Sequence, residues 1–205
     1  MTALRAVVEL GWTENEDAPW PVEPLGEYRW GPLDSTTTAA VIGTVMAATA
    51  DWCRPDDSDY DSVPTAAEAL RWIADSDYLV ICAGVQASDG TTTVNPGCCC
   101  ELNDWHGWAD PRRRSAMWLG HSPEPWIEDT EAGLMVHQDK RPEGEARQSP
   151  VLITTAELPQ LLADLRTDLL GFLAAVERWA VGLTGDPRLA AAVVANIDHH
   201  LGLHP

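Results

Sequence analysis

The sequence contains no long hydrophobic run. None of its apolar stretches reaches the roughly 18 residues that a membrane-spanning helix requires. Residues 1–17 carry one arginine, a short apolar stretch and several acids, whereas an export signal has a basic start and a small-residue cleavage site. We therefore expect no membrane interaction and a cytoplasmic location, and we interpret residues 4–10 as a first strand.

Positive charge is also scarce. The 205 residues include 32 aspartates and glutamates but only 13 arginines and lysines, which gives a formal net charge of −19. Such a chain repels phosphate backbones, so nucleic acid is not expected as a partner. A basic protein partner would be attracted to it electrostatically. The alternative interpretation is that the charge serves solubility alone.

Several motifs that mark enzyme classes are missing. The chain has no G-x-S-x-G, no H-E-x-x-H, no P-loop and no glycine fingerprint for dinucleotides. It also has no internal repeat and no low-complexity segment. These absences favour a non-enzymatic protein that needs no cofactor.

The five cysteines do not form a pattern typical of a disulfide framework. Their number is odd, and a cytoplasmic chain keeps its thiols reduced. Cys53 is isolated, Cys82 lies in an apolar run where a small packing residue is expected, and the other three are consecutive.

The pattern of apolar residues predicts one α+β domain over residues 1–205. Because strands and helices do not alternate strictly, we expect a mostly antiparallel sheet with packed helices. Helices are predicted over 35–53 and 65–74, the second opened by a capping box of Thr65 and Glu68. The predicted strands cover 4–10, 78–87, 91–94 and 151–154, with a hairpin whose arms are 126–129 and 134–139.

The C-terminal part, residues 155–205, is predicted to be an antiparallel helix pair. Thr155 should cap a long helix with one continuous apolar face, and Asp186 and Pro187 suit the cap and first position of a second helix. The chain end, with His200 and His204, is expected to fray. Residues 11–32 are rich in proline and tryptophan, and we expect them to pack as an ordered loop without regular structure. Three polar segments are interpreted as loops or solvated turns: 54–63, 112–114 and 141–150.

The segment NPGCCCELNDWHGW, residues 95–108, contains the main candidate site. A Pro-Gly turn followed by small residues predicts a short helix with Cys98, Cys99 and Cys100 in its first turn. A helix N-terminus lowers the pKa of a thiol, which would suit a nucleophile or a redox couple. The three cysteines could also be packing residues.

A zinc site is the remaining interpretation of this segment. Zinc accepts cysteine and histidine in a tetrahedral set, so the ligands would be Cys98, Cys100, His106 and His121. Cys99 is left out of this set, because the side chains of adjacent residues usually point apart. The triplet also departs from the usual C-x₂₋₄-C spacing of zinc sites.

Tryptophans surround the cysteines. Four of them lie within 22 residues, between positions 105 and 126. Most tryptophans fill cores, but partly exposed ones form hydrophobic patches that anchor protein partners. The candidate binding residues are therefore Cys98, Cys99, Cys100, Asp104, Trp105, His106, Trp108, Trp118, His121 and Trp126.

Three stretches carry a resemblance to known proteins: PGCCCELNDW, LGHSPEPW and LITTAELPQLLADLRTDLLGFL. Over Val94 to Trp179 the chain resembles a group of actinobacterial proteins of unassigned function. In size, charge and layout it is similar to the small acidic immunity proteins that neutralise bacterial toxins. The second resemblance implies a protein-binding role, and neither implies a catalytic residue.

Two hypotheses follow for the function. The leading one is an acidic, non-enzymatic binding protein, of the immunity or inhibitor type, that occludes a basic protein partner with its tryptophan-bearing surface. The rival is a thiol- or zinc-dependent protein centred on Cys98 to Cys100. Exposed tryptophans would also suit a subunit interface, including that of a dimer.

Overall fold

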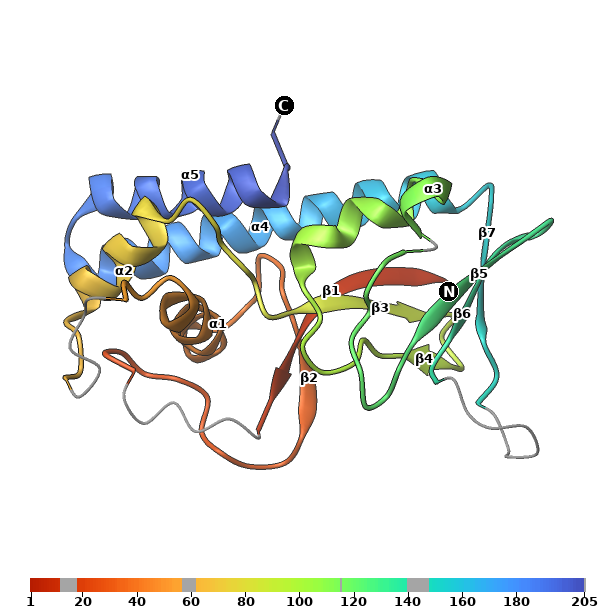
Figure 1. The fold of residues 1–205 in the computed structure, drawn as a ribbon, viewed down its shortest axis with the longest axis horizontal. Coiled ribbons are helices and arrows are strands. Elements are labelled where there is room, and N and C mark those ends of the chain that lie inside the picture. The colour runs from red at the N-terminus through yellow and green to blue at the C-terminus, as the bar shows by residue number, and fades with distance from the viewer. Residues whose placement is uncertain (12–17, 57–61, 115, 140–147, 205) are drawn as a thin grey trace.

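A four-stranded antiparallel sheet lies at the centre of the molecule (Figure 1). The computed structural model describes residues 1–11, 18–56, 62–114, 116–139 and 148–204. The strands of this sheet are, in spatial order, β2 (Arg29–Pro32), β1 (Ala3–Leu10), β3 (Gly84–Ser88) and β4 (Thr93–Val94). As an interior strand, β1 has consecutive buried residues from Ala6 to Val8, because both of its faces are covered.

A second antiparallel sheet has three strands. They are β5 (Trp126–Thr130), β6 (Gly133–His137) and β7 (Val151–Thr154), paired in that order. β5 and β6 form the hairpin that the sequence predicts, and Gly133 at its turn has a φ of 143°, which disfavours any side chain. The α+β class with antiparallel sheets is therefore confirmed.

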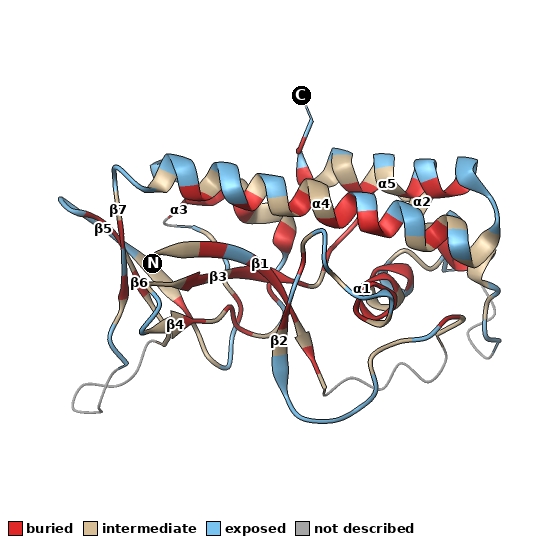
Figure 2. Cartoon of the chain, turned by 180° about the vertical axis from the view of Figure 1, so that it is seen from behind, coloured by how far each residue is buried: buried red, intermediate tan, exposed pale blue. Residues whose placement is uncertain are grey.

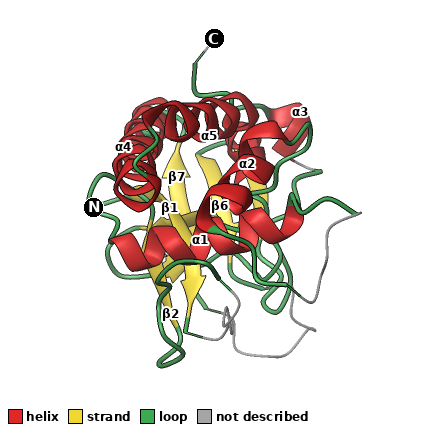
Figure 3. Cartoon of the chain, turned by 90° about the vertical axis from the view of Figure 1, so that its left-hand side faces the viewer, coloured by secondary structure: helices red, strands yellow, loops and turns green. Residues whose placement is uncertain are grey.

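Three helices form a layer over one side of the central sheet (Figure 3). They are α2 (Ala66–Asp75), α4 (Leu158–Thr184) and α5 (Pro187–Leu201). The predicted capping box of Thr65 and Glu68 is present at α2, and Asp186 caps α5 with Pro187 at its start. Gly185 ends α4 in the left-handed conformation, and α5 turns back to pack against α4 as predicted.

The buried side of α4 faces the sheets, as the red stripe in Figure 2 shows. Leu165, Leu169, Phe172 and Val176 recur at helical spacing and are fully buried. They belong to one cluster of buried apolar residues that includes members of both sheets and of α1, α2, α4 and α5. The apolar face predicted for this helix is the one that the structure buries. Among the described helices, none is long and apolar enough to cross a membrane.

Helix α1 (Ala39–Trp52) runs across the direction of α4 (Figure 1). Its N-terminus is capped by Thr38, whose side chain accepts a hydrogen bond from the N–H of Val41. The helical spacing predicted for residues 35–53 is confirmed, although the helix begins at Ala39 because Thr38 takes the cap position.

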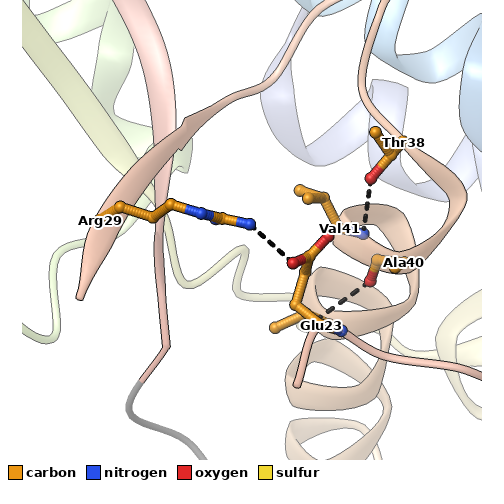
Figure 4. A network of polar contacts seen from close by, with 6 residues as sticks. Glu23, Arg29, Thr38, Ala40 and Val41 are labelled. Atoms are coloured by element: carbon orange, nitrogen blue, oxygen red, sulfur yellow. Dashed lines mark hydrogen bonds and ion pairs between the residues drawn. The ribbon is translucent and has the colours of Figure 1, made fainter. Parts of the chain in front are cut away.

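The segment before β2 is anchored along α1. The indole N–H of Trp20 donates to the carbonyl of Gly43 at 2.8 Å, and the N–H of Glu23 donates to Thr44 Oγ1 at 2.9 Å. The carboxylate of Glu23 in turn pairs with Arg29 at 2.6 Å (Figure 4). These contacts hold β2 opposite α1, and the described part of the predicted loop 11–32 is ordered, with its end forming β2.

The predicted strand over residues 78–87 is wrong in its first half. Leu79 to Ala83 are buried or nearly so, but the strand begins only at Gly84. The side chain of Asn103 donates to the carbonyl of Leu79 and accepts from the N–H of Ile81, so it satisfies backbone groups that a neighbouring strand would otherwise bond.

The predicted fraying of the chain end is also wrong. Leu201 and Leu203 are fully buried, and the carbonyl of Leu203 accepts a hydrogen bond from the guanidinium of Arg166. His204 pairs with Asp198 at 2.7 Å. The end of α5 is therefore held by packing that the polar appearance of the sequence does not reveal.

Two further local predictions need correction. Residues 112–114 are not all in a solvated loop, since α3 (Pro111–Arg114) buries Arg114, which pairs with Asp129 at 3.0 Å. Thr154, not Thr155, exchanges cap hydrogen bonds with Glu157 before α4. The aspartate-rich positions 57–61, the loop positions 141–147 and Trp12 lie outside the described residues.

Candidate functional site

Two loops that are distant in the sequence meet through an antiparallel bridge between Cys98 and His121. The N–H of Cys98 donates to the carbonyl of His121 at 2.7 Å, and the N–H of His121 donates to the carbonyl of Cys98 at 3.0 Å. Side chains directly opposite each other in an antiparallel pair share one face. The thiol of Cys98 and the imidazole of His121 therefore lie next to each other.

Two glycines allow this close approach. A Cβ atom at Gly97 would lie 2.3 Å from the carbonyl oxygen of Pro123 and 2.5 Å from the nitrogen of His121. Gly120 has a φ of +95°, and a Cβ there would lie 2.4 Å from the carbonyl of Gly97. The backbones of PGCCC and LGHSPEPW can touch only because neither position carries a side chain.

Backbone strain is concentrated at the same junction. Cys99 has a φ of 61° and Ser122 a φ of 54°, and they are the positive-φ residues other than glycine in the described part of the chain. This conformation costs roughly 1–2 kcal/mol for each residue that carries a Cβ. Strain of this kind is often found at functional sites.

The left-handed conformation of Cys99 decides where its thiol lies. It turns the side chain to the same side as that of Cys98, and the two Sγ atoms are 3.2 Å apart. The expectation that neighbouring cysteines point apart, which holds for extended backbone, is therefore wrong here.

Three potential metal ligands meet at this point. One ligand atom from each of Cys98, Cys99 and His121 lies within 4.8 Å of the other two. In a tetrahedral zinc site with ordinary bond lengths such atoms are about 3.6–3.8 Å apart, so small side-chain rotations would complete the geometry. Cys99 and His121 are exposed, so an ion can reach the cluster from solvent.

The thiols of Cys98 and Cys100 are poor nucleophiles. Burial, together with the hydrogen bond to Cys99, raises the pKa of Cys98 to about 11. Burial also raises the pKa of Cys100 to about 12, with the nearby charges of Cys82 and Glu9 acting in the same direction. Both thiols are protonated at neutral pH, whereas a reactive cysteine needs a lowered pKa.

The short helix after the triplet begins later than predicted. The short helix η1 (Leu102–Trp108) begins two residues after the triplet, and Glu101 occupies its cap position. The cysteines therefore lie outside the first turn, where the field of the helix would have stabilised a thiolate. The sequence predicts the helix but misplaces its beginning.

The predicted zinc ligands are only partly brought together. Cys98 and His121 belong to the cluster, but Cys100 is buried and Cys99 takes its place. His106 instead contacts the end of α5, where its Nε2 atom lies 2.9 Å from the carbonyl oxygen of Leu201. The set of Cys98, Cys100, His106 and His121 is therefore wrong in two of its four members.

The tryptophans have different roles. Trp105 is buried and donates to the carbonyl of Leu201, and Trp108 is fully buried. Trp126 stacks on His137 in the hairpin, with ring centroids 4.1 Å apart. Trp118 alone among the four is exposed, at 49%, and its ring lies 6.2 Å from that of His121.

The acid expected at the site lies beside it. Asp104 is partly exposed and pairs with Arg113 at 3.8 Å. Asp104 and Glu101 line a small depression of about 10 Å³ together with Trp118. Neither acid belongs to the group of Cys98, Cys99 and His121.

A pocket of about 220 Å³ adjoins the three cysteines. It lies between α1 and the strands β1 and β2, and its walls are mostly apolar. Cys98, Cys99 and Cys100 form one side, while the other lining residues include Val8, Glu9, Trp30, Val45, Ala48 and Cys82.

Apart from Cys98, Cys99 and Cys100, the residues that line this pocket were not identified from the sequence. Glu9 is the single charged residue in the apolar run Ala6 to Leu10, which is a signal that could have singled it out. No comparable signal marks Trp30 or Ala48, because the positions that face them come from distant parts of the chain.

The comparisons with known proteins identify no relative. No protein-family model matches the chain, and neither the curated proteins nor the solved structures give a significant match. The functional argument therefore depends on the geometry of this chain alone.

Proposed function

We propose that the protein binds a thiophilic metal ion through Cys98, Cys99 and His121, with Zn²⁺ as the ion of choice. The observation that carries the proposal is that these three ligand atoms lie within 4.8 Å of one another. Two sulfurs and one imidazole nitrogen form a donor set that zinc accepts in tetrahedral sites. Binding would deprotonate Cys98, whose thiol the surrounding protein keeps protonated.

The arrangement supports an accessible site and not a structural one. Structural zinc is usually enclosed by four protein ligands, whereas this cluster offers three and leaves one position for water or another ligand. Because Cys99 and His121 are exposed, the ion could enter and leave without opening the core. These features suit acquisition, transfer or exchange of the ion.

Metal titration tests the proposal. We expect one Zn²⁺ per chain in purified full-length protein, and a cobalt-substituted form with thiolate-to-metal absorption. Cys98→Ser, Cys99→Ser and His121→Ala should each weaken binding by about 10-fold or more. Cys53→Ser and His137→Ala, which change a thiol and an imidazole elsewhere, should not. Absence of stoichiometric binding in the unaltered protein would refute the proposal.

A second candidate function is the docking of a basic protein partner, as first inferred from the charge of −19. One observation favours a particular surface: the exposed Trp118 shares a depression with Glu101 and Asp104. An indole flanked by carboxylates suits a basic, partly apolar partner segment. Binding of a purified basic partner should weaken with salt and with Trp118→Ala. It should not weaken with Trp52→Ala, which removes another highly exposed tryptophan.

A further inference from the structure

The pocket beside the cysteines has one charged wall. Glu9 on β1 lies directly opposite Trp30 on β2 in the antiparallel register, so the two side chains share a face. Both line the pocket. An indole surface next to a carboxylate is the combination that recognises organic cations, because the ring face and the negative charge both attract them.

Tyr28 packs against the ring of Trp30. Its ring lies edge-on to that of Trp30, with centroids 6.1 Å apart. Burial, together with the nearby carboxylate of Glu9, raises the pKa of Tyr28. A carboxylate has room for further hydrogen bonds, so Glu9 can still accept from a ligand.

The charge of Glu9 is not neutralised by the protein. Arg29, the basic residue next to Trp30, is held by Glu23 at 2.6 Å (Figure 4). No ion pair joins Glu9 to a basic side chain within the described residues. A partly buried carboxylate without a cationic partner is a favourable place for a positively charged ligand.

The remaining walls set the size and character of the ligand. An apolar cavity of 150 Å³ holds benzene, so a pocket of about 220 Å³ accommodates an apolar body with a short amine-bearing chain. Val8, Val45 and Ala48 supply apolar surface for that body. The net charge of −19 would also attract cations toward the molecule.

We infer that this pocket binds a small organic cation, with its ammonium group at Glu9 and Trp30 and its apolar body against α1. The inference goes beyond metal binding and does not depend on it. A zinc ion held by two thiolates and a neutral imidazole would add no net charge, so the pocket would keep its preference for cations when the metal is bound.

Calorimetric titration with matched probes tests this inference. The full chain, in the presence of chelator, is titrated with 2-phenylethylamine and with the neutral, equally sized 2-phenylethanol. We expect the amine to bind at least about 10-fold more tightly, as a charge-assisted contact implies. This comparison needs no variant. An amine that fails to bind, or binds no better than the alcohol, would overturn the inference.

Variants then locate the binding site. Glu9→Gln keeps the shape of the side chain and should remove the preference for the amine while leaving the binding of the alcohol unchanged. Ala48→Leu narrows the pocket and should weaken both probes about 10-fold or more. Ala39→Leu, on the exposed first turn of the same helix, is the control and should change neither. Retention of the amine preference in Glu9→Gln would place the cation elsewhere and overturn the inference.

Discussion

Zinc affinity should rise steeply with pH, because the Cys98 sulfur binds the ion only after its thiol loses a proton. Burial and the hydrogen bond that its thiol makes to Cys99 raise the pKa of Cys98 to about 11. Below that pH, each pH unit increases the apparent association constant about 10-fold for each proton released. Between pH 7 and pH 9, Cys98 alone therefore contributes about 100-fold.

The raised pKa gives this dependence a distinctive shape. An ordinary thiol, with a pKa near 8.5, is largely ionised by pH 9, and its contribution levels off there. Cys98 should continue to contribute up to about pH 10. At pH 7 its thiolate is about 100-fold rarer than it would be without this shift, so zinc binding should be correspondingly weaker than the ligand set alone suggests.

Competition with a chromophoric chelator of known protonation constants, from pH 6.5 to pH 10, measures the slope while buffering free zinc. Cys98→Ser should lower the slope by one proton, whereas Cys53→Ser should leave it unchanged. A slope that levels off near pH 8.5 in the unaltered protein, or that is the same in Cys98→Ser, would show that the reasoning about this thiol is wrong.

Three further predictions concern the same region. Gly97→Ala should abolish zinc binding and lower the free energy of unfolding by about 1–3 kcal/mol in denaturant titrations, since its Cβ would lie 2.3 Å from the carbonyl of Pro123. Gly182→Ala, in helix α4 with nothing within 4 Å of the new Cβ, should keep zinc binding and raise the free energy of unfolding by up to about 1 kcal/mol. The folded-state pKa of Cys100 is raised to about 12, so its contribution to stability is complete below about pH 8.5 and is lost as the pH rises toward 12. Cys100→Ala should flatten that alkaline decline in thermal unfolding, and an unchanged decline would contradict it. The exposed Cys99 should react first with a thiol reagent, and bound zinc should protect it from that reaction. Mass spectrometry measures the extent of labelling. If Cys99 is labelled equally with and without zinc, it is not a ligand.

The local structure follows directly from short-range sequence signals. The capping box of Thr65 and Glu68 and the Asp186-Pro187 helix start involve residues within one helical turn, so their interactions need no distant partner. The hairpin of β5 and β6 and the apolar face of α4 are equally local. Where the prediction fails, at Leu79 to Ala83, the cause is a distant side chain, that of Asn103.

The candidate site depends on contacts that no local pattern encodes. The sequence by itself determined the charge, the helix pair, the hairpin and the presence of three adjacent cysteines. Only the tertiary structure decided that Cys99 replaces Cys100 beside His121, because the left-handed backbone at Cys99 arises where the two loops pack together. It also decided that Glu9 faces Trp30 across a pocket, since strand register and the position of α1 come from long-range packing.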